Sequence, residues 1–322
     1  MKYFIFLLCV LYTDATQYND RPTIGVLSQE TYSTQHLFPG ENYTSFIAAS
    51  YVKNIEASGA RVVPILIGRN RSYYRELLGK INGVVFPGGA TYFNQSNGYA
   101  DAGQYIYEIA QELNDAGHHF PIFGTCLGFE LLIILASGRG RIENRGLCYS
   151  YRSRPLSFTT DFRCSKMYAE MPDDVVNILR TQSVTVNAHQ FCIFDENLRS
   201  HNLTNDWRVT SYSTDNYGVP FISSIEHRRY PFFGTQFHPE TVSYEWRKTS
   251  DIPHTPDALT ANRYFMDFFV KESRKNENLF PDKTEEDQHL IYNYAARFTG
   301  ALGGYYEQIY VFEPREFVLN YK

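Results

Sequence analysis

One stretch of the sequence places a cysteine between two glycines, Gly124-Thr125-Cys126-Leu127-Gly128. An apolar run precedes it and the apolar helical pattern of residues 131–136 follows, which is typical of the cysteine form of a nucleophile elbow. Glycines allow the sharp turn that such an elbow needs. A helix that begins there favours the thiolate of Cys126 and offers the amide of Leu127 to a developing oxyanion. The alternative is a buried structural cysteine at a tight strand-to-helix turn.

A second glycine corner, Pro87-Gly88-Gly89, directly follows the strand-like run "VVF". Consecutive glycines at the carboxyl end of a strand can bring a backbone amide close to the corner of a neighbouring strand. We therefore expect Gly88 or Gly89 to supply a second oxyanion donor. The alternative is an ordinary turn.

A third stretch, Gln236-Phe237-His238-Pro239-Glu240, follows the strand-like run "FFGT". A thiol nucleophile needs a base that shares its proton, and that base needs a group that orients it. A histidine by itself is more often structural, but a carboxylate lies two residues from this one. The pattern therefore predicts a catalytic set of Cys126 as nucleophile, His238 as base and Glu240 as orienting residue.

The elements that must position these residues alternate between strand and helix. Strand patterns cover residues 22–28, 60–67, 81–86 and 121–124, and helical patterns cover 45–58, 71–80 and 101–116. Such alternation predicts an α/β fold with a mostly parallel central sheet and helices on both faces.

Residues 143–203 are less regular, with strand-like pieces at 156–162 and 183–188 around a short helix at 173–179. Later strands are expected at 207–213, 221–226 and 232–236, a helix at 256–274, and strands or aromatic packing segments at 290–294 and 305–312. Without repeats or an obvious linker, residues 20–318 are interpreted as a single domain. Its aromatic tail is expected to pack on the domain or to contact a second copy in a homodimer.

The first 15 residues have a charged start, an apolar run over 3–12 and small residues near Ala15. This pattern predicts a cleaved secretory signal peptide, because the run is too short for a membrane-spanning helix. We expect passage through the secretory pathway to a lysosome, a vacuole or the cell exterior, with no membrane partner. A net charge of −5 without a basic block provides no footprint for nucleic acid.

Cysteines and glycosylation motifs fit a secreted protein. Besides Cys9 and Cys126, the chain contains Cys148, Cys164 and Cys192, of which two at most can form one intramolecular disulfide. The sequence leaves the pair open. Asn-x-Ser/Thr sequons, which predict glycosylation, occur at four positions: Asn42, Asn70, Asn94 and Asn202.

The three motifs "PGG", "GTCLGFE" and "TQFHPE", each after a strand and in this order, resemble the class I glutamine amidotransferase fold, a flavodoxin-like arrangement. Within it the chain is similar to the γ-glutamyl hydrolases, with insertions and a C-terminal extension. The stretches that carry this similarity include "AASYVK", "GARVVP", "INGVVFPGG", "IPHTP" and "LIYNY". They span roughly residues 20–315 of the chain.

The resemblance implies hydrolysis of γ-linked glutamate from folylpoly-γ-glutamates, a small-molecule substrate, through a γ-glutamyl thioester and with no metal or organic cofactor. By position Cys126, His238 and Glu240 match the nucleophile, the general base and its orienting residue. Tyr51, Glu130 and His189 match residues near the active site that handle substrate. Two alternatives stay open: a broader γ-glutamyl peptidase acting on small peptides, and a catalytically silent secreted binding protein of the same fold.

Overall fold

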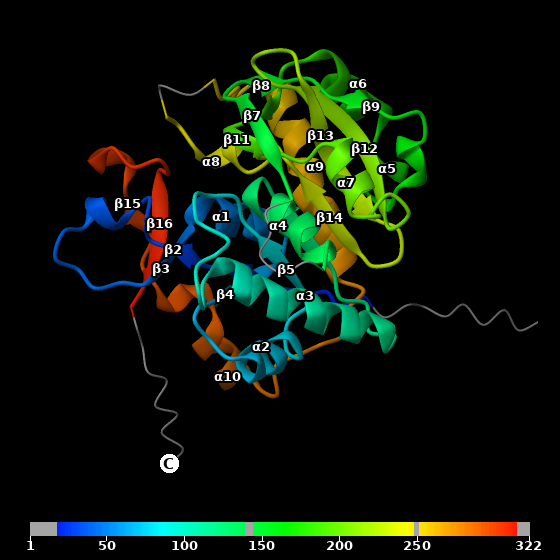
Figure 1. Ribbon diagram of the computed structural model, residues 1–322. Helices are drawn as coiled ribbons and strands as arrows, with labels where there is room; N and C mark the ends of the chain where they lie inside the picture. Colours follow the sequence, from blue (N-terminus) through cyan, green and yellow to red (C-terminus); the bar gives the residue numbers. More distant parts are fainter. Residues whose placement is uncertain (1–17, 139–143, 248–250, 314–322) are drawn as a thin grey trace, which may run out of the picture.

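A central eight-stranded sheet organises the chain, in the order β4-β1-β5-β6-β14-β13-β12-β9 (Figure 1). The computed structural model describes residues 18–138, 144–247 and 251–313; the expected signal peptide, residues 1–15, lies outside them. The first five strands in this order are parallel to one another. They are β1 (Thr23–Leu27), β4 (Arg61–Ile65), β5 (Gly83–Phe86), β6 (Ile122–Thr125) and β14 (Phe232–Thr235). The strand segments predicted for this parallel half of the sheet are confirmed.

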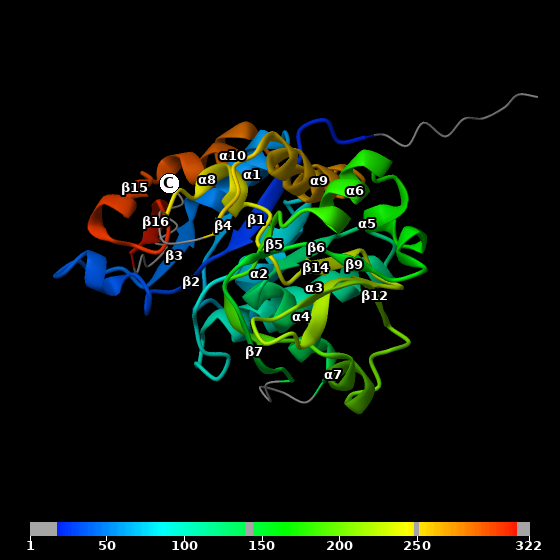
Figure 2. The same cartoon turned by 90° about the horizontal axis from the view of Figure 1, so that it is seen from above.

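Helices cover both faces of the sheet (Figure 2). On one face lie α1 (Ala49–Ala57) and α9 (Pro256–Ser273), and on the other lie α2 (Arg71–Leu78), α3 (Tyr99–Asp115) and α4 (Leu127–Ala136). Side chains of a strand alternate between its two faces: Val62 and Phe123 belong to the core beneath α1 and α9, whereas Val63 and Ile122 belong to the core beneath the other three helices. The predicted α/β fold with a parallel centre is confirmed.

The other half of the sheet is antiparallel. It consists of β13 (Pro220–His227), β12 (Trp207–Thr214) and the short β9 (Ser157–Phe158). The strand predicted over 156–162 is wrong beyond Phe158, because the chain turns into a 3₁₀ helix at Phe162–Cys164. Within 183–188 only β10 (Thr185–Val186) is a strand, paired with β8 (Ser153–Arg154). The helices of this region are α5 (Lys166–Ala169), α6 (Asp173–Thr181) and α7 (Asp195–Ser200).

Two strands above the sheet, β7 (Gly146–Ser150) and β11 (His189–Cys192), form an antiparallel pair. They lie in the upper part of the molecule in Figure 1. Residues 145, 151 and 188–191 of the irregular segment 143–203 line the same cleft as Cys126 and His238.

A second sheet joins the two ends of the chain, in the order β15-β16-β3-β2. The helix predicted over 45–58 is wrong at its start, because residues 45–48 pair with the C-terminal extension, Phe46 opposite Val311. The strands are β2 (Gln29–Glu30), β3 (Ser45–Ala48), β15 (Arg297–Phe298) and β16 (Gln308–Phe312). Backbone pairing with a distant segment overrides the local helical pattern here.

The remaining elements are short. The segment 290–294 forms a 3₁₀ helix, Ile291–Asn293, rather than a strand. The others are α8 (Thr241–Tyr244), α10 (Lys283–His289) and the 3₁₀ helices Gln35–Leu37 and Gly300–Leu302. None of the helices in the described ranges combines the length and hydropathy needed to cross a membrane.

Candidate active site

Cys126 lies at the corner between β6 and α4 with a φ of 50°, in the region that side chains rarely adopt. Its N–H donates to the Thr235 carbonyl on β14 at 2.7 Å, which holds the strained corner against the sheet. A Cβ at Gly128 would lie 2.0 Å from the Phe86 carbonyl oxygen on β5, and one at Gly124 would lie 2.6 Å from the Gly128 oxygen. The glycines are therefore required by close backbone packing, and the predicted strand–elbow–helix arrangement is present.

His238 and Glu240 follow β14, the strand next to β6. Their side chains are 5% and 2% exposed, and Nδ1 of His238 lies 2.8 Å from Oε1 of Glu240. This contact leaves Nε2 as the ring nitrogen available to other groups, and no hydrogen-bond partner of Nε2 occurs within the described residues. The predicted base and orienting residue are thus brought together by a turn of two residues.

Burial by itself lowers the pKa of His238, but the negative charges of Cys126 and Glu240 act in the opposite direction. Their combined effect outweighs burial, so the pKa of His238 lies well above its ordinary value of 6.5. An imidazolium opposite a thiolate is the protonation state that a cysteine nucleophile requires.

Tyr51 connects the histidine to the second glycine corner. Its hydroxyl accepts the Gly88 N–H at 2.7 Å and lies 3.3 Å from Nδ1 of His238. The tyrosine is buried, which raises the pKa of its hydroxyl well above 10. A Cβ at Gly88 would lie 2.6 Å from Cε1 of His238 and 3.1 Å from Cβ of Cys126. The space between these two residues therefore has no room for a side chain at position 88. The Gly88 amide is occupied by Tyr51, which leaves Gly89 as the amide of this corner that can receive an oxyanion.

Two residues of this site, Gln236 and Arg145, were not predicted from the sequence. The Gln236 amide nitrogen lies 2.9 Å from Oε1 of Glu130 and 3.9 Å from Sγ of Cys126. Oε2 of Glu130 pairs with Arg145 at 2.6 Å, and the guanidinium packs 4.0 Å from the centre of the Phe191 ring. Gln236 lies two residues before His238 in the sequence, which is the one signal that could have pointed to it.

A cleft connects these groups. One hollow of about 480 Å³ is lined by the predicted residues Gly89, Cys126, Leu127, Glu130, His189 and His238. A second of about 290 Å³ shares His238 with it and extends past Glu245 and Arg247. His238 therefore lies where the two hollows meet, whereas Tyr51, Gly88 and Glu240 are not among the residues that line them.

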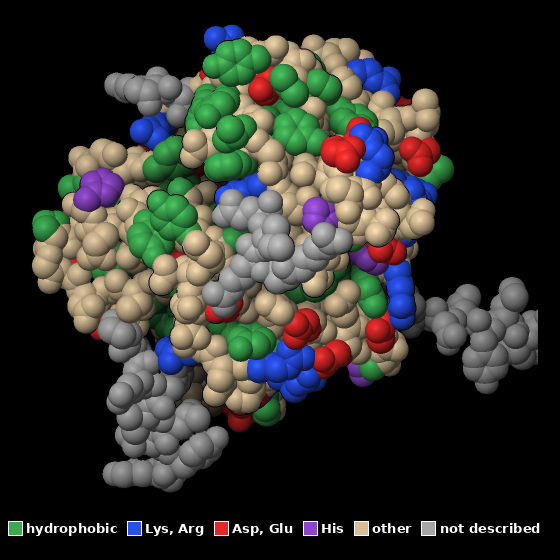
Figure 3. Space-filling model, in the orientation of Figure 1, with side chains coloured by type: hydrophobic (Ala, Val, Ile, Leu, Met, Phe, Trp, Pro, Cys, Tyr) green, Lys and Arg blue, Asp and Glu red, His purple; other side chains and the backbone are tan. Residues whose placement is uncertain are grey.

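Aromatic side chains surround the mouth of the cleft. Tyr32, Tyr92, Tyr151 and Tyr305 line it and are each about half exposed. Figure 3 shows hydrophobic side chains gathered on the upper part of this face, where β7 and β11 lie in Figure 1. Tyr305 comes from the aromatic tail, which packs on the domain as one of the two expected arrangements.

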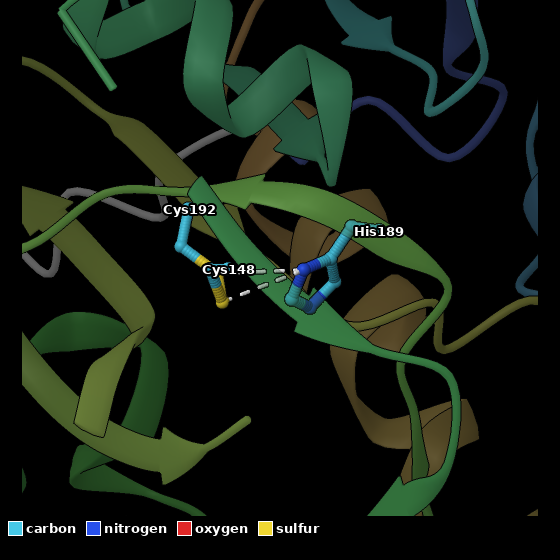
Figure 4. Close-up of side chains that lie close together, drawn as sticks. All are labelled: Cys148, His189 and Cys192. Atoms are coloured by element: carbon cyan, nitrogen blue, oxygen red, sulfur yellow. Dashed lines mark hydrogen bonds between the residues drawn. A yellow bond between two sulfur atoms is a disulfide. The ribbon is translucent and has the colours of Figure 1, made fainter. Parts of the chain in front are cut away.

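His189 occupies the cleft wall beside a disulfide between Cys148 and Cys192 (Figure 4). The structure thus selects the pair that the sequence left open, and Cys164 is a free exposed thiol. Burial lowers the pKa of His189 to about 3, with a further lowering by the charge of His238, so this imidazole is neutral. Cys148 lies in a cross-link, whereas Cys126 is a free thiol at the elbow.

The four asparagines of the predicted glycosylation motifs lie at the surface of the protein. Asn42, Asn70, Asn94 and Asn202 are all exposed. Exposure is the condition that an N-linked glycan requires.

Comparison with known proteins identifies the family. The Peptidase C26 family model matches residues 22–240. The chain is 36% identical to "Gamma-glutamyl hydrolase" of Rattus norvegicus over 91% of this chain and 90% of that protein. The corresponding identity to "Gamma-glutamyl hydrolase" of Homo sapiens is 35%, over 91% and 90%. For "Gamma-glutamyl hydrolase 1" of Arabidopsis thaliana it is 31%, over 92% and 84%. The chain therefore belongs to the peptidase C26 family, together with these γ-glutamyl hydrolases.

Proposed function

We propose that this protein hydrolyses γ-glutamyl peptide bonds, with Cys126 as nucleophile and folylpoly-γ-glutamates as substrates. The observation that carries the proposal is the meeting of three chemical elements at one cavity: the Cys126 thiol, the His238 imidazole, and the backbone amides of Leu127 and Gly89. Within the described residues, neither amide donates to another group of the chain. Free amides beside a nucleophile are the elements of an oxyanion hole.

In the first half of the reaction, Sγ of Cys126 attacks the γ-carbonyl carbon of the substrate. The Leu127 and Gly89 amides stabilise the negative charge that develops on the carbonyl oxygen. Nε2 of His238 then gives its proton to the departing α-amine, and the C–N bond breaks to leave a γ-glutamyl thioester on Cys126.

In the second half, His238 accepts a proton from water while the water attacks the thioester. Glu240 orients the imidazole through its 2.8 Å contact with Nδ1 and stabilises the imidazolium. The Tyr51 hydroxyl lies 3.3 Å from the same Nδ1. Glu130 and His189 contribute to the wall that holds the substrate. Hydrolysis of the thioester regenerates the free thiol of Cys126, and the proposed steps use neither a metal nor a cofactor.

The shape of the cleft supports a large leaving group. Since His238 protonates the leaving amine, that portion of the substrate must lie on the His238 side. The second hollow extends from there past the cationic side chain of Arg247. A leaving glutamate carries carboxylates, which a guanidinium can bind.

We also propose that the protein passes through the secretory pathway to a lysosome, a vacuole or the exterior, with residues 1–15 removed and glycans on the sequons. The Cys148–Cys192 disulfide supports an oxidising compartment. Removal of N-linked glycans by an endoglycosidase is expected to increase the electrophoretic mobility of the secreted protein.

The activity is tested by mass spectrometry of the products from pteroylpentaglutamate, γ-glutamyl dipeptides and glutamine. Shortened folates are expected from the wild type, and Cys126→Ala is expected to lose about six orders of magnitude in kcat. Cys164→Ala, at the exposed thiol, is the matched control and retains activity. Cleavage of the small peptides alone would indicate a broader γ-glutamyl peptidase, and no cleavage at all would indicate a silent binding protein.

A further inference from the structure

We propose that Cys148, Cys192 and His189 form a redox-dependent site for a thiophilic divalent cation of the zinc and cadmium type, which binds when the disulfide is reduced. The three side chains come from β7 and β11, are buried, and offer ligand atoms that all lie within 4.8 Å of one another (Figure 4). Two thiolates and one imidazole are a ligand set that such cations favour.

The hydrogen bonds of Asn187 determine which nitrogen of His189 is free. Nδ2 of Asn187 donates to the Thr185 carbonyl at 3.0 Å and to the Arg152 carbonyl at 3.4 Å. The amide oxygen therefore faces His189 and accepts from its Nε2 at 3.1 Å. In a neutral imidazole only one nitrogen carries a proton, so Nδ1 keeps its lone pair.

This lone pair is directed at the sulfurs. Nδ1 of His189 lies 3.4 Å from Sγ of Cys192 and 3.9 Å from Sγ of Cys148. A disulfide sulfur has no proton to donate, so in the oxidised protein neither sulfur can satisfy Nδ1. The contact of Nε2 with Asn187 is also the outer hydrogen bond that holds a metal-binding imidazole in its tautomer and orientation.

The backbone keeps the two cysteines adjacent without the cross-link. Their Cα atoms are 5.6 Å apart, and β7 pairs with β11 at Leu147 opposite Phe191 and at Gly146 opposite Cys192. Ladder hydrogen bonds do not depend on the oxidation state of sulfur. The ligands of the reduced protein therefore remain close together before a cation binds.

Reduction of the disulfide precedes binding of the cation. An external dithiol or phosphine supplies two electrons, and with two protons the S–S bond becomes two thiols. Binding of the divalent cation releases two protons as two metal–sulfur bonds form, while Nδ1 of His189 donates its lone pair. Of the three ligands, His189 lines the cavity that contains Cys126, so the cation would enter from the cleft.

The test is a titration of the full chain with Cd²⁺, followed by the ultraviolet charge-transfer absorption of cadmium–thiolate bonds. Cys9, Cys126 and Cys164 are replaced by serine, which leaves the pair as the only sulfhydryl source. With excess phosphine we expect saturation at one Cd²⁺ per chain, and without phosphine no band. An absent band in the reduced protein, or an equal band in the oxidised protein, would overturn the proposal.

His189→Asn in the same background should weaken Cd²⁺ binding at least tenfold, whereas His36→Asn, at an exposed histidine, should leave it unchanged. Near-ultraviolet circular dichroism reports whether the reduced protein keeps its fold. Equal affinity of the His189→Asn and His36→Asn variants would overturn the site, because two thiolates in an unfolded chain would bind without the imidazole. The readout is independent of catalysis, so its failure is distinguishable from failure of the proposed hydrolase activity.

Discussion

His238 and Glu240 share a buried contact of 2.8 Å between Nδ1 and Oε1, although only Pro239 separates them in the sequence. The turn after β14 directs both side chains to the same side. Glu240 thereby holds the imidazole through Nδ1, and His238 lines the cleft that also contains Cys126.

Replacement of this carboxylate should cost most of the activity. In Glu240→Gln the neutral amide no longer stabilises the imidazolium, and we expect kcat to fall by about 10⁴-fold, as for the equivalent change in a serine-protease triad. Glu196→Gln, at an exposed carboxylate, is the control. Steady-state kinetics with a γ-glutamyl substrate checks this, and a loss under tenfold would contradict the role of Glu240.

The same variant should alter the dependence of stability on pH. The folded protein raises the pKa of His238, so the positive charge on this imidazole contributes to stability. This contribution is fully present below pH 6.5 and is lost as pH rises through the pKa that His238 has in the folded protein. Without Glu240 the folded pKa is lower, so this loss occurs at lower pH. Thermal unfolding from pH 5 to 9, with an NMR titration of the His238 ring, measures the displacement; identical titrations in both proteins would refute it.

Gln236→Leu removes the amide that lies between Glu130 and Sγ of Cys126. A hydrogen bond to a charged group contributes about 1.5–3 kcal/mol, so we expect kcat/KM to decrease roughly 10- to 100-fold. Alkylation of Cys126 by iodoacetamide should slow in parallel, which a loss of substrate contacts alone would not produce. Gln104→Leu, at an exposed position of α3, is the control, and unchanged alkylation would exclude Gln236 from activation of the thiol.

Gly128→Ala should destabilise the fold at the elbow. The added Cβ would lie 2.0 Å from the Phe86 carbonyl oxygen, so backbone must move. We expect a loss of about 1–3 kcal/mol or more and a lower Tm. The control is Gly79→Ala, where φ is −70° and the nearest atom lies 3.5 Å away, so stability should be unchanged or slightly higher. Equal Tm values for the two variants would show that the elbow tolerates a side chain.

Glu245 provides a second prediction about pH. Burial raises the pKa of its carboxyl from 4.5 to about 7, although the Glu307 amide donates to it at 2.7 Å. A raised carboxyl pKa contributes stability below pH 4.5 that is lost as pH rises through about 7. Compared with Glu245→Gln, the wild type should therefore lose up to roughly 3 kcal/mol between pH 4.5 and 8. Chemical denaturation at both pH values measures it, and parallel behaviour of the two proteins would contradict the assignment.

Much of the site could be predicted because its signals are local. An elbow needs glycines within two residues of Cys126, and an oriented base needs a carboxylate near His238. Each requirement is met within its own stretch of five residues, 124–128 for the elbow and 236–240 for the base. Strand-and-helix alternation likewise predicted the parallel centre of the sheet, since each element buries its own periodic face.

Tertiary structure decided what depends on contacts between distant segments. The contact of Gln236 with Glu130 spans 106 residues, and the disulfide spans 44. The strand at residues 45–48 exists because β16, more than 250 residues away, supplies its backbone partner. No local pattern encodes such partners, because a backbone amide or a thiol has the same chemistry wherever it lies. The fold alone determines which groups it meets.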